Sequence, residues 1–282
     1  MTETLEYNSW LRDFVARSEH PFIRDSEAMV EYLLQLDTKV PAEYGWRVMD
    51  RDTFKERVLE QIGNRNLVED VNRIYWQDMA RCIEASGVVM VWRGAELVRA
   101  SLRLLNGGEI LAPAALARSL LELAASGISN SNVIEKSVRE SLAQAPDKTV
   151  IISTEIEELV VRILYGTRMA ELPDYPKQTN ALTYIQRVSK NPNASELISV
   201  YEFLCDLTHP NVLGNARFWA AIDSKNEDGS ETLRMERCAE SVTTSQIREK
   251  TLWAIGWSSA CVRNSFEIGQ DAVRMILQRW PR

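Results

Sequence analysis

The chain has 282 residues, of which 45% are apolar, and this is enough for one large domain or for a core domain with a small satellite. Its 40 acidic and 33 basic residues give a formal net charge of -7, which disfavours an extended nucleic-acid surface and leaves only a local basic patch open. The four cysteines, Cys82, Cys205, Cys238 and Cys261, are far apart and form no Cys-x-x-Cys pair, so we expect reduced core thiols.

Other classes of site and location are disfavoured by the same simple features. With only two histidines in the chain, no metal site is expected, and no motif suggests a cofactor. The N-terminus has no basic region followed by an apolar run, so we expect no signal peptide and a cytoplasmic location. Residues 111–128 are apolar, but Arg118 and Glu122 near their centre would each cost roughly 2.5 to 3.5 kcal/mol in a membrane. We therefore expect a buried helix of a soluble protein, with no membrane partner.

The N-terminal part, residues 1–65, is expected to form a helical cap region. Ser26 is a good N-cap for a helix over residues 26–37, and a short helix is expected over residues 52–62. From Leu67 onward, apolar residues recur at helical spacing as far as Leu105, where Asn-Gly-Gly stops the pattern. This spacing predicts one very long helix.

The remainder, residues 66–282, is expected to form the main bundle. Shorter helices are predicted over residues 111–128, 131–144, 153–165, 178–189 and 194–209. Two segments with period-two alternation flank Asp228-Gly229 and predict a β-hairpin at about 216–236. A last long helix is expected from Thr243–Ser245 to about Gln278. The predicted fold is mainly α, an antiparallel helical bundle with two long helices and one small β-hairpin.

A candidate site lies where two of these predicted helices can face each other. Tyr201 and His209 lie on the core-facing side of the helix over residues 194–209. Arg118 and Glu122 are four residues apart on the helix over residues 111–128, whose other residues are uncharged. Buried charges persist mainly when they are paired and hydrogen-bonded, so we expect these four side chains to form one cluster.

This cluster has two interpretations. In the first, it is a structural clamp between helices, because structural ion pairs perturb ionisable groups as much as functional ones do. In the second, it is a pocket where His209 acts as acid or base with Glu122, Arg118 holds an anion, and Tyr201 and Asn211 contact the ligand. A weaker candidate is a phosphate-binding edge of Arg93, Arg99 and Arg103, which a solvated helix face also explains.

A family resemblance follows from these motifs. An apolar helix with the Arg-x-x-x-Glu of ARSLLEL, a later Tyr-x-x-Leu helix ending in His-Pro and then a short hairpin resemble a group of uncharacterised bacterial helical proteins. That group is similar in general shape to HEPN domains, which occur in toxins and phage-defence systems. The likeness covers roughly residues 66–278.

The ribonuclease motif of HEPN domains is absent from this sequence. HEPN ribonucleases carry an arginine, four to six residues, and then a histidine on one helix. The positions that would hold this arginine are Glu202, Phe203 and Leu204 before His209, and Asp13, Phe14 and Val15 before His20. Ribonuclease activity is therefore not implied by the motif itself.

Three classes of function follow. A regulatory or interaction protein in a stress or phage-defence setting comes first, because no enzyme motif is complete. A HEPN-like ribonuclease or nucleotide-handling enzyme is the alternative, and a sensor of a small anionic ligand through Arg118, Glu122 and His209 is the third. The expected partners are RNA or a small anion, and a second copy of the chain bound through the C-terminal helix with Trp253 and Trp257.

Overall fold

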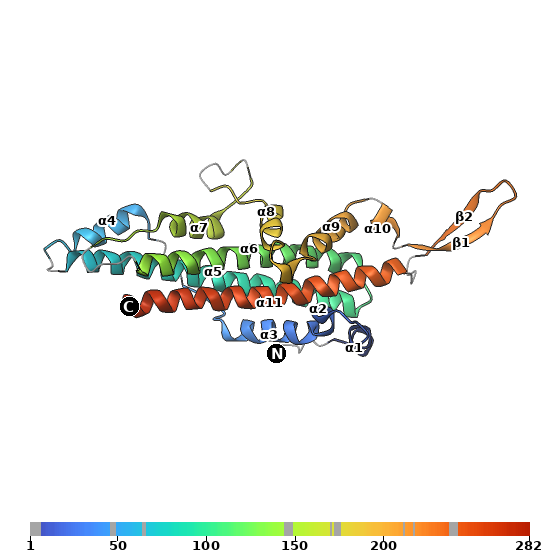
Figure 1. Ribbon diagram of the computed structural model, residues 1–282, viewed down its shortest axis with the longest axis horizontal. Helices are drawn as coiled ribbons and strands as arrows, with labels where there is room; N and C mark the ends of the chain where they lie inside the picture. Colours follow the sequence, from blue (N-terminus) through green and yellow to red (C-terminus); the bar gives the residue numbers. More distant parts are fainter. Residues whose placement is uncertain are drawn as a thin grey trace.

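Long helices running side by side dominate the computed structural model (Figure 1). It describes residues 7–45, 49–63, 66–143, 149–169, 171, 176–210, 212–216, 218–236 and 242–282. Within these ranges three helices exceed 30 residues: α5 (Leu67–Asn106), α6 (Leu111–Ala143) and α11 (Val242–Arg279). A tight turn with Gly108 at a φ of 82° reverses the chain between α5 and α6, and α11 packs against both. The predicted mainly α fold is confirmed.

One prediction about the long helices is wrong. Residues 111–128 and 131–144 were expected to form two helices, but α6 runs without a break through Ser129, Asn130 and Ser131. These residues have modest helix propensity, yet all three are buried, with exposures of 6%, 8% and 7%. Tertiary packing therefore outweighs local preference, and the bundle gains a third long helix.

Shorter elements cover the long helices. They are α1 (Ser9–Ala16), α2 (Pro21–Arg24), α3 (Ser26–Lys39), α4 (Arg51–Leu59), α7 (Thr154–Tyr165), α8 (Ala181–Val188), a 3-10 turn (Pro192–Ala194), α9 (Leu197–Thr208) and α10 (Val212–Ala216). Strands β1 (Trp219–Lys225) and β2 (Glu231–Met235) pair antiparallel, with Gly229 at a φ of 83° in the turn. The predicted hairpin is confirmed, and it projects from one end of the bundle (Figure 1).

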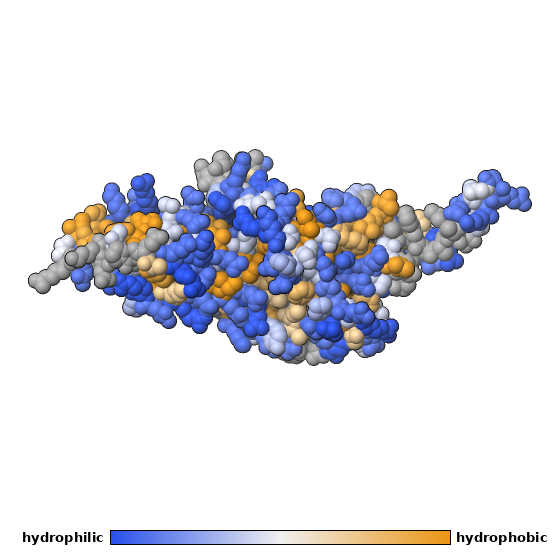
Figure 2. All heavy atoms as spheres, in the orientation of Figure 1, coloured by the Kyte–Doolittle hydropathy of each residue, from blue (hydrophilic) through white to orange (hydrophobic). Residues whose placement is uncertain are grey.

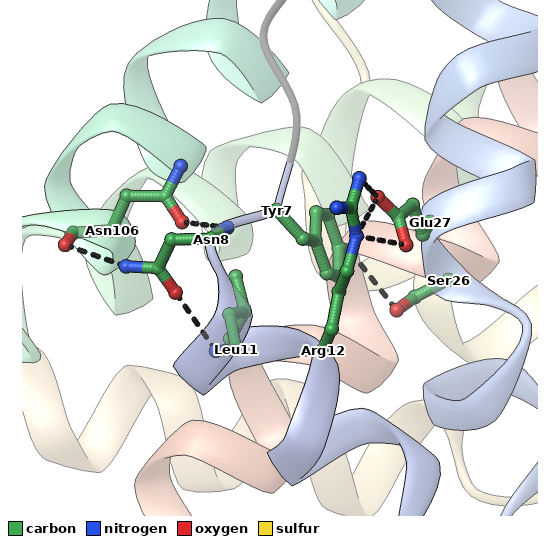
Figure 3. A network of polar contacts seen from close by, with 7 residues as sticks. All are labelled: Tyr7, Asn8, Leu11, Arg12, Ser26, Glu27 and Asn106. Carbon is green, nitrogen blue, oxygen red and sulfur yellow. Dashed lines mark hydrogen bonds and ion pairs between the residues drawn. The ribbon is translucent and has the colours of Figure 1, made fainter.

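The N-terminal helices are tied to the long helices by polar contacts (Figure 3). The Asn8 side chain accepts from the Leu11 N–H at 2.8 Å and so caps α1, and it also donates to the Asn106 carbonyl at the end of α5. Tyr7 donates to Ser26 at the start of α3. These helices thus pack on the bundle; the domain boundary at residue 65 stays a prediction.

Two aromatic stacks lie in the interior. Trp76 of α5 stacks on Trp280, which follows α11, with ring centroids 5.6 Å apart. Trp253 and Trp257 of α11 stack at 5.9 Å and are only 2% and 4% exposed. Because Trp253 and Trp257 fill the core of this one chain, their side chains are not available at a subunit interface in this structure.

Two other sequence predictions bear on the surroundings of the site. Cys82 is buried and Cys205 and Cys261 are half-buried, and all three are free thiols, while Cys238 lies outside the described residues. By length and composition alone, α6 is the described helix that suits a membrane span. Its apolar face contacts α5, α8, α9 and α11, which is the environment of a central bundle helix.

Candidate functional site

A polar cluster joins α6 to α9. Tyr201 donates a hydrogen bond of 3.0 Å to Oε1 of Glu122, and the same oxygen lies 3.3 Å from Nε of Arg118. Arg118 also donates from Nη1 to Oγ1 of Thr208 at 3.2 Å. Its guanidinium lies 5.8 Å from the centre of the Tyr201 ring. The structure thus brings together Arg118, Glu122 and Tyr201, as the sequence predicts.

The cluster is less buried than the sequence suggests. The side chains of Arg118 and Glu122 are 31% and 32% exposed, so the expectation of a buried charge pair is wrong. Helix α9 packs on α6, yet both side chains remain accessible to solvent at this contact. Burial still raises the pKa of Tyr201, and the hydrogen bond to Glu122 raises it further, so the phenol is a donor.

His209 does not join the cluster. Thr208 is the last residue of α9, and His209 has an extended backbone with φ -86° and ψ 151°. Proline at the next position disfavours the helical conformation for His209, so its side chain leaves the stripe that Tyr201 follows. The imidazole is exposed and forms no hydrogen bond or ion pair with Arg118 or Glu122. Asn211, the other expected ligand-binding residue, lies outside the described residues.

At the end of α9, Thr208 and Cys205 contact the cluster in place of His209. The Thr208 hydroxyl donates to the Cys205 carbonyl at 2.9 Å and is thereby oriented to accept from Arg118. Cys205 lies against Tyr201, and burial raises the pKa of its thiol. Thr208 lies on the same helical stripe as Tyr201, which is the signal in the sequence that marks it.

A cavity of about 550 Å³ lies beside the cluster, and we refer to it as the arginine cavity. Its walls come from α5, α6, the start of α8 and the segment between α7 and α8. The lining residues are Arg93, Glu96, Leu97, Ser119, Glu122, Leu123, Ser126, Arg168, Gln178, Thr179, Ala181 and Tyr184. Glu122 therefore belongs both to this wall and to the contact between α6 and α9.

Two arginines distinguish this cavity. Arg93 reaches it from α5 and Arg168 from the segment after α7. Neither has an ion-pair or hydrogen-bond partner in the part of the chain that the structure describes. By contrast, Arg99 forms an ion pair with Asp37, so it is not part of a free phosphate-binding edge. Reasoning from sequence named Arg93 only as a weak candidate and missed Arg168, which lies outside any recognisable motif.

A second cavity, of about 350 Å³, adjoins the first, and we refer to it as the apolar cavity. Its lining includes Val89, Met90 and Trp92 of α5, Leu123 and Ile134 of α6, and Ile163 and Leu164 of α7, together with Asn130 and several serines. Hydrophobic residues reach the surface of the bundle beside α8 in Figure 2. Within the described residues, no group of three or more His, Cys, Asp or Glu side chains is placed to hold a metal ion.

Comparisons of the chain with protein-family models, with curated proteins and with solved structures give no match. The chemistry of the site therefore has to be argued from its own residues.

Proposed function

We propose that the chain is a regulatory protein that binds a small anionic ligand in the arginine cavity. The observation that carries this proposal is that Arg93 and Arg168, from separate segments, face one cavity without a partner among the described residues. Guanidinium groups suit carboxylate and phosphate oxygens because they offer several donors in a fixed plane.

The charges around the cavity support an anion. Glu122 is paired with Arg118 at 3.3 Å, which offsets part of its repulsion of an anion. Glu96 is exposed, as Arg93 and Arg168 are, so water screens all three charges and the two arginines outnumber this one carboxylate. Ser119, Ser126, Gln178 and Thr179 add neutral hydrogen-bonding groups along the wall. In a chain with net charge -7, this is a local site for an anion and not an extended basic surface.

Glu122 provides the regulatory link in this proposal. An anion in the cavity lies beside a carboxylate that accepts the hydrogen bond from Tyr201 of α9. Added negative charge there changes the free energy of the contact between α6 and α9, and a ligand shifts a conformational equilibrium by its differential affinity for the two states. Helix α9 leads through α10 to the projecting hairpin, which we propose as the element that responds.

The other functions remain hypotheses. A HEPN-like ribonuclease needs an arginine near its histidine, and Arg118 reaches Thr208 and not the His209 imidazole. A metal-free cleavage assay on structured RNA tests this alternative directly. The stress or phage-defence setting and the cytoplasmic location rest on the resemblance and on composition.

Isothermal titration of inorganic pyrophosphate tests the proposed function. The variants Arg93→Gln and Arg168→Gln should each raise the dissociation constant about tenfold, because each removes one charge-assisted contact. Arg73→Gln is the matched control, since it removes the same charge from α5 at a site paired with Asp70 and outside the cavity. Equal binding by all three variants, or no binding by the wild type at millimolar pyrophosphate, would contradict the proposal.

A further inference from the structure

The arginine cavity and the apolar cavity adjoin each other along a shared wall. Arg93, Leu123, Ser126 and Gln178 line both of them. Along α5 the combined wall extends from Ile83 to Leu97, which is roughly 20 Å at the rise of an α-helix. A ligand held by its anionic group at Arg93 can therefore place the rest of its body in the apolar cavity.

The apolar cavity is bounded by the close approach of α5, α6 and α11. Gly87, Gly127 and Gly269 come from these three helices and all line it. A Cβ at Gly127 would lie 2.6 Å from Sδ of Met90 and 3.2 Å from Oγ of Ser265, so the helices meet tightly at this end. The space is small and has defined walls, as a site for one or two rings requires.

Asn130 is the unusual residue of this cavity. It is only 8% exposed, and its amide has no hydrogen-bond partner in the described part of the chain. The nearby hydroxyls of Ser86, Ser126 and Ser131 donate to carbonyls of their own helices, and none of them forms a hydrogen bond with Asn130. Its amide atoms are not among the fully buried unpaired polar atoms, so they remain open to the cavity that Asn130 lines. A donor and an acceptor that face a cavity without a protein partner can pair with a ligand group there.

We propose that the ligand is an amphipathic anion with a small aromatic body that carries its own hydrogen-bonding group. The phosphate or carboxylate lies at Arg93 and Arg168, which rests on the proposed function. The rings lie among Met90, Trp92 and Leu164, and a ring N–H or ring nitrogen pairs with the Asn130 amide. A simple hydrocarbon chain fits less well, because it would cover that amide and leave it unpaired.

Four phosphate compounds test this inference by titration calorimetry: inorganic phosphate, octyl phosphate, 1-naphthyl phosphate and 3-indolyl phosphate. The two aryl phosphates should bind more tightly than inorganic phosphate, and indolyl phosphate about tenfold more tightly than naphthyl phosphate. Asn130→Leu should remove the difference between the two aryl compounds and leave inorganic phosphate unchanged. Ser86→Leu adds bulk at the cavity wall and should weaken both aryl compounds.

The outcomes separate this inference from the proposed function. The inference of an aromatic ligand is wrong if aryl phosphates bind no more tightly than inorganic phosphate, or if octyl phosphate binds as tightly as indolyl phosphate. Either result leaves the proposed anion site unaffected. If indolyl phosphate binds with full affinity to Arg93→Gln and Arg168→Gln, the proposed anion site is wrong. A circular dichroism melt of each variant confirms that it is folded before its affinity is compared.

Discussion

The phenol of Tyr201 donates a 3.0 Å hydrogen bond to Oε1 of Glu122, and this bond connects α9 to α6 at the wall of the arginine cavity. Arg118 contacts the same carboxylate and also reaches Thr208 at the end of α9. The carboxylate of Glu122 therefore connects two helices and also lines the cavity in which we propose that an anion binds.

Removal of this bond should have a small effect on stability. Tyr201→Phe keeps the ring and deletes the donor, so we expect the free energy of unfolding to fall by about 1 kcal/mol. Glu122→Ala should also cost only about 1 kcal/mol, because the pair with Arg118 is partly solvated, whereas a fully buried pair would cost about 3 to 5. Urea unfolding measures both, with Glu202→Ala on the exposed side of α9 as the control.

A loss of several kcal/mol for Glu122→Ala alone would show that the charges are less accessible to water than their exposure indicates. No loss for Tyr201→Phe would show that water replaces the phenol at the carboxylate.

Helical periodicity was sufficient to predict three members of this cluster. Arg118 and Glu122 are neighbours on one face by spacing alone, and Tyr201 follows the apolar stripe of α9. The same periodicity failed for His209, because the helix ends one residue earlier and Pro210 imposes an extended backbone on the histidine. Arg168 was not predictable, since a residue between helices is placed by tertiary contacts and not by a local pattern.

Some helix boundaries could also be predicted from the sequence, and others could not. The stop at Asn106-Gly107-Gly108 and the hairpin at Asp228-Gly229 were predictable because a glycine with positive φ stands at each turn. The break expected near Ser129 did not occur, because burial between neighbouring helices outweighs the weak preference of Ser-Asn-Ser for a turn.

Asp78 should make stability depend on pH. Its side chain is 5% exposed on α5, and Oδ1 has no hydrogen-bond partner among the described residues. Burial raises the pKa of Asp78 from 3.8 to about 6, and the nearby charges are Arg81 of α5, Arg57 of α4 and Glu157 of α7. The folded state holds the proton more tightly than the unfolded state does, so stability contributed by Asp78 falls as pH rises from about 4 to about 6.

Asp78→Asn should remove this dependence. A shift of about two pKa units corresponds to roughly 3 kcal/mol, so the variant should be more stable than the wild type at pH 7 by up to this amount. At about pH 3 the two should be alike, since the carboxyl is then mostly protonated in both states. Urea midpoints across this range measure the difference, and the exposed Asp13→Asn is the control. Parallel pH profiles for wild type and Asp78→Asn would refute the prediction.

Two glycines of α11 give a matched pair of substitutions. A Cβ at Gly256 would collide with the backbone carbonyl of Phe22 and lie 3.1 Å from the Cβ of Ser26. A Cβ at Gly269 would lie 3.7 Å from Cγ2 of Ile83, an ordinary contact. Gly256→Ala should therefore cost about 1 to 3 kcal/mol by forcing α2 and α3 away from α11. Gly269→Ala should raise stability by up to about 1 kcal/mol through helix propensity.

Thermal unfolding followed by circular dichroism measures both changes. If the melting temperature falls equally for the two variants, the loss at Gly256 does not come from its close contact with Phe22 and Ser26.

Two questions about the C-terminal helix can be tested separately: whether the chain forms a homodimer, and whether the tryptophans of this helix lie in the interface. Trp253 and Trp257 are buried inside the chain and stack on each other, and Trp253 also contacts Phe22. Trp257→Ala should therefore lower the free energy of unfolding by about 3 to 5 kcal/mol at every protein concentration, as expected for a large core truncation. An interface residue would instead change the concentration at which subunits dissociate.

Light scattering provides the second measurement. A homodimer has twice the chain mass of 32.1 kDa, and if it forms, Trp257→Ala should keep that mass wherever the variant remains folded. A monomeric mass for the wild type would refute the dimer. A folded Trp257→Ala monomer beside a wild-type dimer would show that these rings contact the second subunit, contrary to their placement in the core of this chain.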